Sequence, residues 1–159
     1  MTPLRPQWLG RVPYTQALTA QRVHRTKVIA GEAPEAVWLL EHDPVITTGR
    51  RKVHSLPSAE HLAQHRTELV RTERGGLATW HGPGQLVAYV IVDAWSRSLG
   101  ARGLICAIED GVIAYLANLG ITAHRRPGFP GVWVKKDKIC AIGMHFSRGV
   151  SMHGIALNL

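Results

Sequence analysis

The feature that most constrains this chain is a glycine-rich stretch that runs directly into an apolar one. Residues 75–84 hold four glycines and one proline, interleaved with Thr79, Trp80 and His81. Leu86–Val92 follows and is uniformly apolar, which is typical of a buried strand. Glycine reaches positive φ and lets a ligand approach the main chain, so the stretch predicts a binding loop fixed to a strand. A plain turn between two strands is the alternative that glycine and proline alone leave open.

Two helices stand out elsewhere in the chain. Residues 14–30 predict a helix whose apolar face begins with Leu18 and Val23, continues at residues 28 and 29, and ends before Gly31. Residues 104–119 give the clearer pattern, because apolar residues recur there at spacings of three and four, and Gly120 supplies a C-terminal cap. A further short helix mixed with loop is expected within residues 53–66.

Short extended runs fill most of the remaining sequence. Strands are expected at residues 37–42, 45–48, 121–124, 144–147 and 150–159, with a loop at 126–131. A hairpin is expected to join 132–134 to 139–142 across the lysine-rich turn 135–138. Strands mixed with helices, without regular βαβ alternation, predict an α+β fold in a single domain spanning residues 1–159.

Composition narrows the classes of function. The chain has 159 residues, 45% of them hydrophobic, and a net charge of +8. No apolar run approaches the ~20 residues that span a bilayer, and the first residues lack a signal-peptide core, so we expect no membrane association. The only two cysteines, Cys106 and Cys140, argue against a disulfide scaffold and predict a cytoplasmic location.

The positive charge predicts an acidic partner. The basic residues are dispersed and form no nucleic-acid module, so no nucleic acid is expected. No His-Glu-x-x-His pattern occurs, so neither a metal nor a cofactor is expected.

Four segments in order resemble one known family, the lipoyl (octanoyl) transferases. These enzymes move an octanoyl chain from acyl carrier protein to a lysine of lipoate-dependent enzymes. The likeness covers nearly the whole chain. The segments that carry it are Leu39–Arg50, Arg74–Tyr89, Gly131–Val134 with Lys138–Gly143, and His153–Asn158.

The resemblance implies an α+β domain with mixed or antiparallel sheets and flanking helices, similar to the biotin and lipoate protein ligases and their class II synthetase-like fold. It implies Lys138 as the catalytic lysine, acting on a cysteine nucleophile. The implied partners are octanoyl-acyl carrier protein and the lipoyl domains of 2-oxoacid dehydrogenases and of glycine cleavage H protein. The implied substrate-binding residues are Arg74, Gly75, Gly76, Leu77, Ala78, Thr79, Trp80, His81, Ala141, Ile142, Gly143, Gly154, Ile155 and Ala156.

One departure from the family concerns the nucleophile. The family's cysteine lies in a Pro-Cys-Gly motif shortly after the His-Gly-x-Ala-Leu-Asn segment, whereas this sequence stops at Leu159. We therefore expect a domain that lacks its C-terminal portion and is inactive as it stands. Cys140 lies between apolar neighbours and Cys106 lies in an apolar helix, so both are expected to be structural.

The chemistry assigns further roles in the acyl site. Lys138 can stabilise a thiolate as a cation or act as a base when neutral. His81 and His153 are expected either to orient groups by hydrogen bonds or simply to pack. The backbone amides expected to stabilise an oxyanion belong to Gly75, Gly76, Ile142 and Gly143. The residues expected to form an apolar slot for the acyl chain are Leu77, Trp80, Val132 and Ile155. The arginines expected to meet acidic partners are Arg50, Arg51, Arg125 and Arg126.

Two alternative functions stay open. An ATP-dependent lipoate or biotin protein ligase shares the expected fold, although the loop here reads Trp-His-Gly-Pro-Gly-Gln rather than the glycine run associated with those ligases. A non-catalytic acyl-binding module is the second alternative. Dependence on ATP separates the first from a transferase, and absence of acyl transfer identifies the second.

Overall fold

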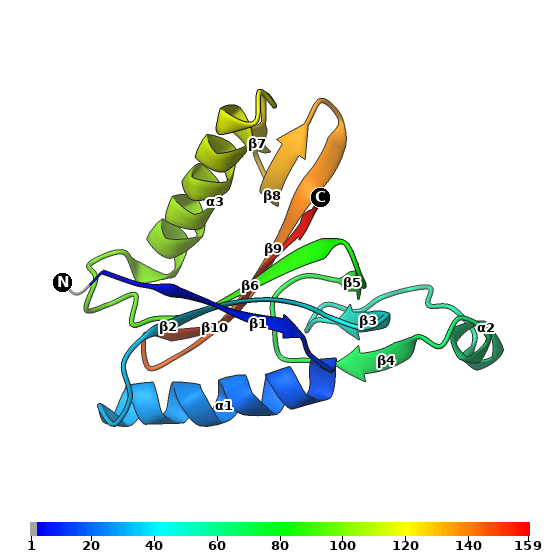
Figure 1. Cartoon of the computed structure of the whole chain (residues 1–159), viewed down its shortest axis with the longest axis horizontal. Coiled ribbons are helices and arrows are strands. Elements are labelled where there is room, and N and C mark those ends of the chain that lie inside the picture. Colours follow the sequence, from blue (N-terminus) through cyan, green and yellow to red (C-terminus); the bar gives the residue numbers. More distant parts are fainter. Residues whose placement is uncertain (1–2) are drawn as a thin grey trace.

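A computed structural model describes residues 3–159, which form two sheets and three helices (Figure 1). The larger sheet has seven strands in the order β1-β2-β6-β10-β9-β8-β7, and the smaller has three in the order β4-β3-β5. The strands are β1 (Pro6–Arg11), β2 (Ala36–Glu41), β3 (Val45–Thr48), β4 (Glu68–Arg71), β5 (Ala78–His81), β6 (Gln85–Ile91), β7 (His124–Arg126), β8 (Phe129–Val134), β9 (Asp137–Ser147) and β10 (Val150–Asn158). The helices are α1 (Tyr14–Ala30), α2 (Ala59–Gln64) and α3 (Gly100–Asn118).

Both sheets are mixed, which confirms the predicted α+β class. Strand β1 runs parallel to β2, and β4 runs parallel to β3, while the other pairings are antiparallel. The central pair is β6 and β10, in which Gly154 lies opposite Tyr89 and Ala156 opposite Val87. Two segments that are distant in the sequence are thereby fixed side by side.

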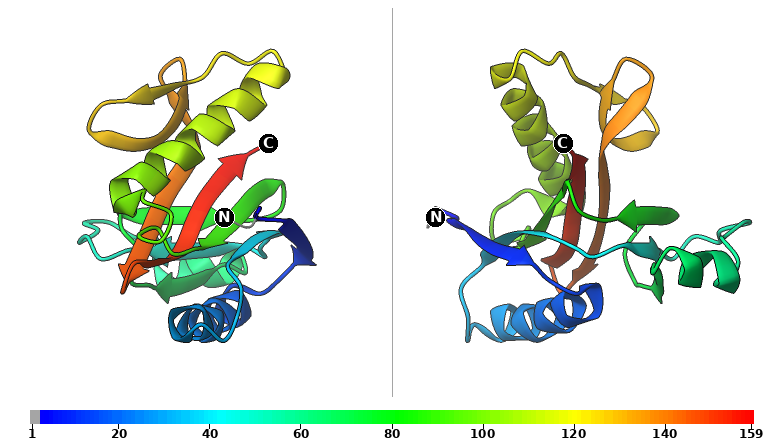
Figure 2. Two further views of the ribbon diagram at one scale, coloured as in Figure 1. Left: turned by 90° about the vertical axis from the view of Figure 1, so that its left-hand side faces the viewer. Right: turned by 45° about the vertical axis from the view of Figure 1, so that its right-hand side comes forward.

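Helices α1 and α3 cover opposite faces of the larger sheet (Figure 2). On the α3 face, Leu116 packs with Cys140 of β9 and Leu157 of β10. On the α1 face, Ala17 packs with Val87 and Tyr89 of β6. Side chains of a strand alternate between its faces, so neighbouring residues of β6 contribute to two separate cores.

The limits of α1 agree with the prediction, but its predicted apolar face was partly wrong. Its buried residues are Tyr14, Ala17, Leu18 and Gln21, at spacings of three and four. Val23 is 53% exposed. Five residues of helix turn the chain by about 500°, which places Val23 roughly 140° away from Leu18. The helix ends at Gly31, whose amide bonds to the carbonyl of Val28.

Helix α3 and the strand after it differ from the expected boundaries. The helix begins at Gly100, four residues earlier than predicted, and ends at Asn118, with the Gly120 amide bonded to Ala117. The expected strand at 121–124 was wrong, because β7 covers His124–Arg126 and pairs with β8. The expected loop at 126–131 is likewise partly strand.

Several extended segments were missed or assigned to loops. Strands β1 and β4 were not predicted, and Thr79, Trp80 and His81 lie in strand β5 rather than in a loop. The hairpin turn contains only residues 135 and 136, so Lys138 lies on β9 opposite Trp133. Pairing across each sheet, which short-range periodicity does not report, accounts for these differences. Within residues 3–159, none of the helices is long and apolar enough to span a membrane.

Candidate active site

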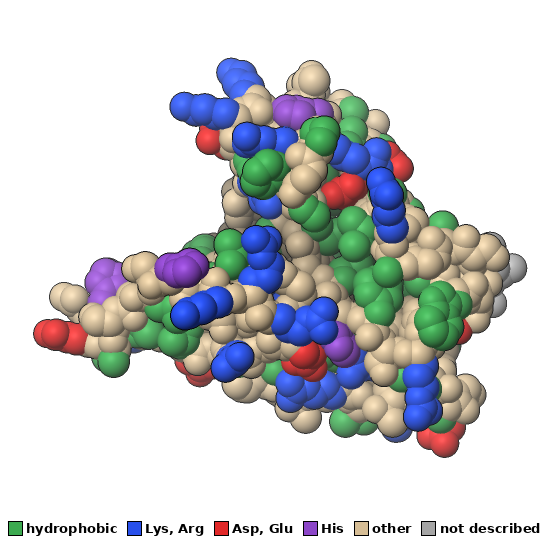
Figure 3. All heavy atoms as spheres, turned by 180° about the vertical axis from the view of Figure 1, so that it is seen from behind, with side chains coloured by type: hydrophobic (Ala, Val, Ile, Leu, Met, Phe, Trp, Pro, Cys, Tyr) green, Lys and Arg blue, Asp and Glu red, His purple; other side chains and the backbone are tan. Residues whose placement is uncertain are grey.

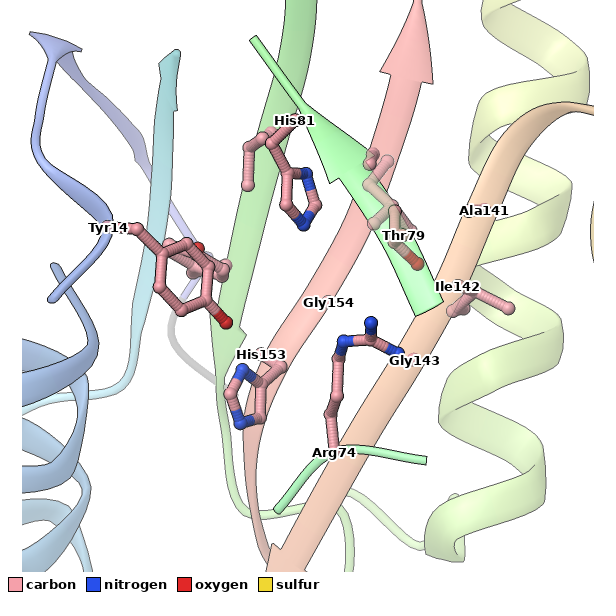
Figure 4. Close-up of a pocket in the computed structure, with 13 residues that line it drawn as sticks. Tyr14, Arg74, Thr79, His81, Ala141, Ile142, Gly143, His153 and Gly154 are labelled. Carbon is pink, nitrogen blue, oxygen red and sulfur yellow. The ribbon is translucent and has the colours of Figure 1, made fainter. Parts of the chain in front are cut away.

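A small pocket, with a cavity volume of about 40 Å³, opens on the α1 face of the larger sheet, where four parts of the chain meet (Figure 4). Its walls are formed by helix α1, the segment around Arg74, strands β5 and β6, and the facing stretches of β9 and β10. The residues that line it are Tyr14, Arg74, Thr79, His81, Val87, Tyr89, Ala141, Ile142, Gly143, His153, Gly154, Ile155 and Ala156. Polar and apolar groups converge in this lining, as they do in small-molecule sites.

Arg74 is buried at the pocket wall, with only 7% of its surface exposed. Its Nη2 donates to the carbonyl and Oγ1 of Thr47, at 2.7 and 2.8 Å, and its Nη1 donates to the carbonyl of Gly75 at 2.9 Å. Burial lowers the pKa of this guanidinium, yet an arginine keeps its charge at neutral pH. The pocket therefore contains a cation held in a fixed orientation.

Two glycines allow the strands and the Arg74 segment to approach this closely. A Cβ at Gly143 would lie 2.9 Å from the carbonyl oxygen of Gly75 and 3.4 Å from Cδ of Arg74. A Cβ at Gly154 would collide with the carbonyl of Ala88 on β6. The glycines at these two positions of β9 and β10 thus have a steric cause in the packing of backbone against backbone.

His81 is neutral and its ring orientation is fixed. Its Nδ1 donates to Oε1 of Gln85 at 2.7 Å, and its Nε2 lies 3.2 Å from Oγ1 of Thr47. The Gln85 amide is oriented in turn, because its Nε2 donates to Oδ1 of Asn158 at 2.9 Å. Burial lowers the pKa of His81 to about 4. The side chain can therefore exchange hydrogen bonds with a substrate without carrying charge.

A second set of buried polar side chains lies behind the pocket. Tyr89 donates its hydroxyl hydrogen to Nε2 of His42 at 2.7 Å, and Nδ1 of His42 donates to the carbonyl of Val12 at 2.6 Å. Tyr14 stacks on His81 with ring centroids 5.8 Å apart. Burial raises the pKa of Tyr14 to about 12 and that of Tyr89 well above its ordinary value, so both phenols stay protonated.

His153 has the most unusual environment in the pocket. It is 2% exposed, has a left-handed φ of 64°, and neither ring nitrogen has a hydrogen-bond partner among residues 3–159. Its backbone amide donates to Oε1 of Gln21 at 2.9 Å, and Nε2 lies 4.0 Å from Oε2 of Glu73. Burial lowers its pKa to about 3. A strained backbone and unsatisfied buried nitrogens are typical of functional positions.

The structure brings together many, but not all, of the residues singled out from the sequence. Those that line the pocket are Arg74, Thr79, His81, Ala141, Ile142, Gly143, Gly154, Ile155 and Ala156. Those outside its lining are Gly75, Gly76, Leu77, Ala78, Trp80 and Lys138. The Gly75 amide already donates to the carbonyl of Met144 at 3.0 Å, so it is not free for an oxyanion. The Gly76 amide donates to no other residue within 3–159.

The expected acyl slot needs correction. Of its four expected residues only Ile155 lines the pocket. Val132 is fully buried against α3 on the other face of the sheet, and Leu77 and Trp80 are about half exposed. The apolar side chains on the pocket side are instead those of Val87, Ala141 and Ala156, because Ile142 and Ile155 pack into the clusters on the α3 face.

Lys138 lies at the hairpin end of β9. Its Nζ donates to the carbonyl of Pro130 at 2.8 Å and lies 4.9 Å from the ring centroid of Trp133. Partial burial lowers its pKa. In the described structure its amine is directed toward the β8 backbone rather than into the pocket.

Neither cysteine is suited to attack a thioester. Cys140 is fully buried in the α3-side cluster, and burial raises the pKa of its thiol to about 12. Cys106 lies on α3, where its carbonyl accepts a hydrogen bond from Arg125. Only a thiolate attacks readily, so the expected structural role of Cys140 agrees with its environment.

Sequence reasoning missed four residues that build the site, namely Tyr14, Gln21, Thr47 and Tyr89. Tyr14 and Gln21 lie seven residues apart on the buried face of α1, so a helical reading that included polar residues would have found them. Thr47 carried no signal beyond its β propensity. The smaller sheet places it next to Thr79 and thereby beneath the arginine.

Basic side chains gather on the face seen in Figure 3, around a hollow whose floor is partly hydrophobic. A groove there is lined by Thr48, Gly49, Arg50, Arg51, Lys52, Val53, Leu56, Leu69 and Arg71. Its backbone is joined to the pocket segment, because the Arg50 amide donates to the carbonyl of Arg74 at 3.0 Å. Arg125, in contrast, is paired with Glu109 and Asp110.

Solved structures of lipoate protein ligases have the same fold as this chain. Lipoate-protein ligase A bound with ATP superimposes with a TM-score of 0.75 at 16% identity, covering 99% of this chain and 67% of that one. The bipartite lipoate protein ligase of Thermoplasma acidophilum gives a TM-score of 0.71 at 17% identity, covering 98% of this chain and 61% of that one. Identities this low establish the fold alone.

Comparison of sequences finds relatives of higher identity. The model of the lipoyl protein ligase A/B catalytic domain matches residues 13–159. An octanoyltransferase of Halorhodospira halophila is 43% identical over 96% of this chain and 68% of its own length, and one of Chromohalobacter salexigens is 42% identical over 100% and 70%. The chain thus spans about two-thirds of the length of these curated relatives. It belongs to the octanoyltransferases of the lipoyl protein ligase A/B catalytic domain family.

Proposed function

We propose that this protein transfers an octanoyl or lipoyl group from acyl carrier protein to a specific lysine of a lipoyl domain. The acceptors would be the lipoyl domains of 2-oxoacid dehydrogenases and glycine cleavage H protein. One observation carries the proposal. Three segments that the octanoyltransferase resemblance assigns to the substrate line a single pocket, which has an apolar wall and polar groups at fixed positions.

The reaction proceeds in two acyl transfers. A cysteine thiolate attacks the thioester carbonyl, the tetrahedral intermediate collapses, and the carrier's thiolate leaves. The amine of the acceptor lysine then attacks the acyl-enzyme, loses a proton, and releases the cysteine thiolate as the amide forms. Arg74, a fixed cation in the pocket wall, is suited to stabilise the oxyanion of each intermediate.

We assign the attacking thiolate to a cysteine outside these 159 residues. Cys140 is buried and its pKa is raised to about 12, and Cys106 lies on α3 away from the pocket lining. The 159-residue chain alone is therefore expected to form no octanoyl adduct when incubated with an octanoyl thioester. Intact mass spectrometry tests this, and an adduct mapped to Cys140 would refute the assignment.

The direct test is an acyl-transfer assay with the full-length protein. Octanoyl-acyl carrier protein and an unmodified lipoyl domain should yield an octanoylated lysine without ATP. A requirement for ATP and a free acid would instead identify a ligase. Binding of the acyl group without any transfer would identify a non-catalytic module.

Lys138 is proposed as the lysine that activates the thiolate. Lys138→Ala should lower the rate of acyl-enzyme formation by about a hundredfold or more, within the range typical of acid–base groups. Lys136→Ala is the matched control, since Lys136 is an exposed residue of the same hairpin and should retain the wild-type rate. Equal rates in the two variants would remove Lys138 from the mechanism.

Acidic carrier and lipoyl domains are proposed to approach the basic groove next to the pocket. Arg50 and Arg51 are the favoured contacts, because Arg125 is already neutralised by Glu109 and Asp110. Arg126 packs against Phe129 and Trp133 at 4.7 and 5.1 Å from their ring centroids. Charge steering of this kind is expected to weaken as salt concentration rises.

A further inference from the structure

Helix α3 carries a buried carboxylate that binds the first part of strand β8, which lies next to it (Figure 1). Glu109 is only 6% exposed. Its Oε1 accepts a hydrogen bond from the Gly131 amide at 2.8 Å, and its Oε2 accepts one from Nε of Arg125 at 2.8 Å. A carboxylate removed from water is costly unless its oxygens are bonded. These two bonds therefore fix the carboxylate and the Gly131 amide against each other.

The peptide bond between Pro130 and Gly131 has a charged side chain at each end. Its N–H donates to Glu109, while its carbonyl accepts a hydrogen bond from Nζ of Lys138 at 2.8 Å. The bond is trans, so its N–H and carbonyl point in opposite directions within one rigid plane. The carboxylate thus lies at the positive end of the peptide dipole and the ammonium at the negative end. Hydrogen bonds in such a chain strengthen one another. Glu109 therefore orients the acceptor that binds Lys138.

The rest of the Lys138 side chain is constrained as well. A Cβ at Gly131 would lie 3.4 Å from Cδ and Cε of this lysine, so its stem passes directly over the glycine. The same Cβ would collide with the carbonyl of Cys140. The ring centroid of Trp133 lies 4.9 Å from Nζ. The amine makes no other hydrogen bond among residues 3–159 besides the one to Pro130. Two of the three N–H groups of the ammonium therefore stay available for a thiolate.

Glu109 is also the carboxylate that acts on the charge of this lysine. Among residues 3–159, no ion pair joins Lys138 directly to an acidic side chain. Partial burial lowers the pKa of Lys138, whereas Cys140 and Glu109 act in the opposite direction. The Cys140 thiol is neutral at pH 7, because burial raises its pKa to about 12. Asp110, the next residue of α3, is exposed and binds Arg125. At neutral pH it is therefore Glu109 that favours the charged form of the lysine.

We propose that Glu109 is a positioning residue for the reaction, which keeps the Lys138 ammonium in place for the thiolate through the single peptide unit between Pro130 and Gly131. The inference rests on the proposed function, because Lys138 is itself a proposed catalytic group. Glu109 does not line the pocket. It therefore acts on the rate of acyl-enzyme formation and not on binding of the acyl group.

Titration of the Lys138 amine by NMR, in full-length protein labelled at lysine Cε, measures the coupling directly. Glu109→Gln keeps the length of the side chain and an acceptor for the Gly131 amide, but it removes the charge. The Lys138 signal is identified by its absence in Lys138→Ala. Its titration midpoint should fall by roughly half a pH unit or more in Glu109→Gln, because an opposite charge that favours the ammonium is lost. An unchanged or raised midpoint would overturn the proposal.

Asp110→Asn is the matched control, because Asp110 and Glu109 both bind Arg125 but only Glu109 binds the Gly131 amide. This control should leave the Lys138 midpoint at its wild-type value. A fall of equal size in both variants would assign the effect to Arg125 and overturn the role of the peptide. Should Glu109→Gln not fold, Glu109→Asp withdraws the carboxylate from the peptide by one methylene and must still lower the midpoint. An unchanged midpoint in that variant would reject the proposal equally.

The pH dependence of acyl-enzyme formation connects this contact with the reaction. Lys138→Ala should remove one limb of the pH–rate profile, and Glu109→Gln should move that limb to lower pH by the same amount as the midpoint, with KM for the octanoyl donor unchanged. A merely structural role would leave the limb in place, which would overturn the inference. A limb that ignores Glu109→Gln in an enzyme that needs Lys138 rejects this inference alone. A midpoint that responds to Glu109→Gln in a protein that transfers nothing rejects the proposed function and keeps the coupling.

Discussion

The two faces of the seven-stranded sheet are built from different chemistry. On the α3 face, Leu116, Val132 and Cys140 form an apolar cluster. On the α1 face, an arginine, three histidines, two tyrosines and a glutamine are buried or nearly so around the pocket. These side chains are Tyr14, Gln21, His42, Arg74, His81, Tyr89 and His153. Side chains alternate between the two faces along β6, β9 and β10. The same strands therefore contribute one set of residues to the apolar cluster and another set to the pocket.

The difference also explains why the pocket is on the α1 face. Buried polar groups must be hydrogen-bonded, and on this face nearly all of them are held by a partner on another element. The exceptions are Nε2 of Gln21 and the two ring nitrogens of His153. They lie side by side at the pocket, because the His153 amide donates to the Gln21 side chain. Among residues 3–159, the buried side-chain atoms without a hydrogen-bond partner thus lie at or beside the pocket.

The largest expected effect is a loss of stability in acid, which should arise from the α1 face of the sheet and not from the α3 face. The native pKa values of His81 and His153, about 4 and about 3, lie below the ordinary value of 6.5, so the unfolded chain takes up protons first. Their contribution to stability is complete above pH 6.5 and is lost as pH falls toward 4 and 3. Between pH 6.5 and pH 4.5 only the unfolded chain takes up these protons, so at about 1.4 kcal/mol per pH unit each histidine lowers stability by roughly 3 kcal/mol over that interval. Urea unfolding at pH 7 and pH 4.5 measures the loss.

A pair of variants sharpens this test. His81→Gln removes one titrating group from the α1 face and should reduce the pH dependence of stability by less than half, because the pKa values of His42, His145 and His153 are also lowered. His54→Gln removes an exposed histidine and should leave that dependence unchanged. The same acid sensitivity in all three proteins would show that the neutral histidines of the pocket do not govern it.

The α3 face should respond to loss of volume rather than to pH. Leu116 is 1% exposed, and Leu116→Ala should lower the free energy of unfolding by about 3 kcal/mol, within the usual range for such cavities. The loss should be the same at pH 7 and pH 4.5, because the cluster contains no histidine. A loss of less than 1 kcal/mol in urea unfolding would contradict the assignment of the main core to this face.

Cys140 tests the polarity of the α3 face on a smaller scale. Cys140→Ala removes a small apolar group and should cost about 1 kcal/mol. Cys140→Ser buries a hydroxyl among apolar neighbours and should cost a further 1–2 kcal/mol. Thermal unfolding of the two variants provides the comparison. A serine variant as stable as the alanine variant would indicate that Cys140 is solvated, contrary to its full burial.

Local periodicity was sufficient to predict the parts of the fold that are regular over many residues. The helix at 14–30, the strands around 45–48 and 85–91, and the α+β class were predicted from spacing and turn residues. Strands β1, β4 and β5 were not, because they are short and depend on partners distant in sequence. Pairing such as Val45 with His81 leaves no mark in either segment alone.

The candidate site, like the fold, was predictable only in part. The motif residues from Arg74 to His81, from Ala141 to Gly143 and from Gly154 to Ala156 were identified by resemblance, and many of them line one pocket. The sequence did not reveal that Thr47 holds the arginine or that Tyr14 closes the pocket from α1. Each reaches the site through a contact between elements more than twenty residues apart, which no single motif contains.

The smallest predicted effect concerns the ion pair at the edge of the pocket. Arg22 holds Glu73 by two bonds and lowers the pKa of that carboxyl to about 2, yet the arginine is half exposed. Arg22→Met should therefore lower stability by less than about 1 kcal/mol at pH 7. The stability from this carboxylate is present above its ordinary pKa of 4.5 and is lost as pH falls toward 2, so the variant should equal wild type below pH 2. An NMR titration should show the pKa of Glu73 rising toward 4.5 in the variant. An unchanged pKa would mean that another cation holds the carboxylate, and Arg25 would be the first to test.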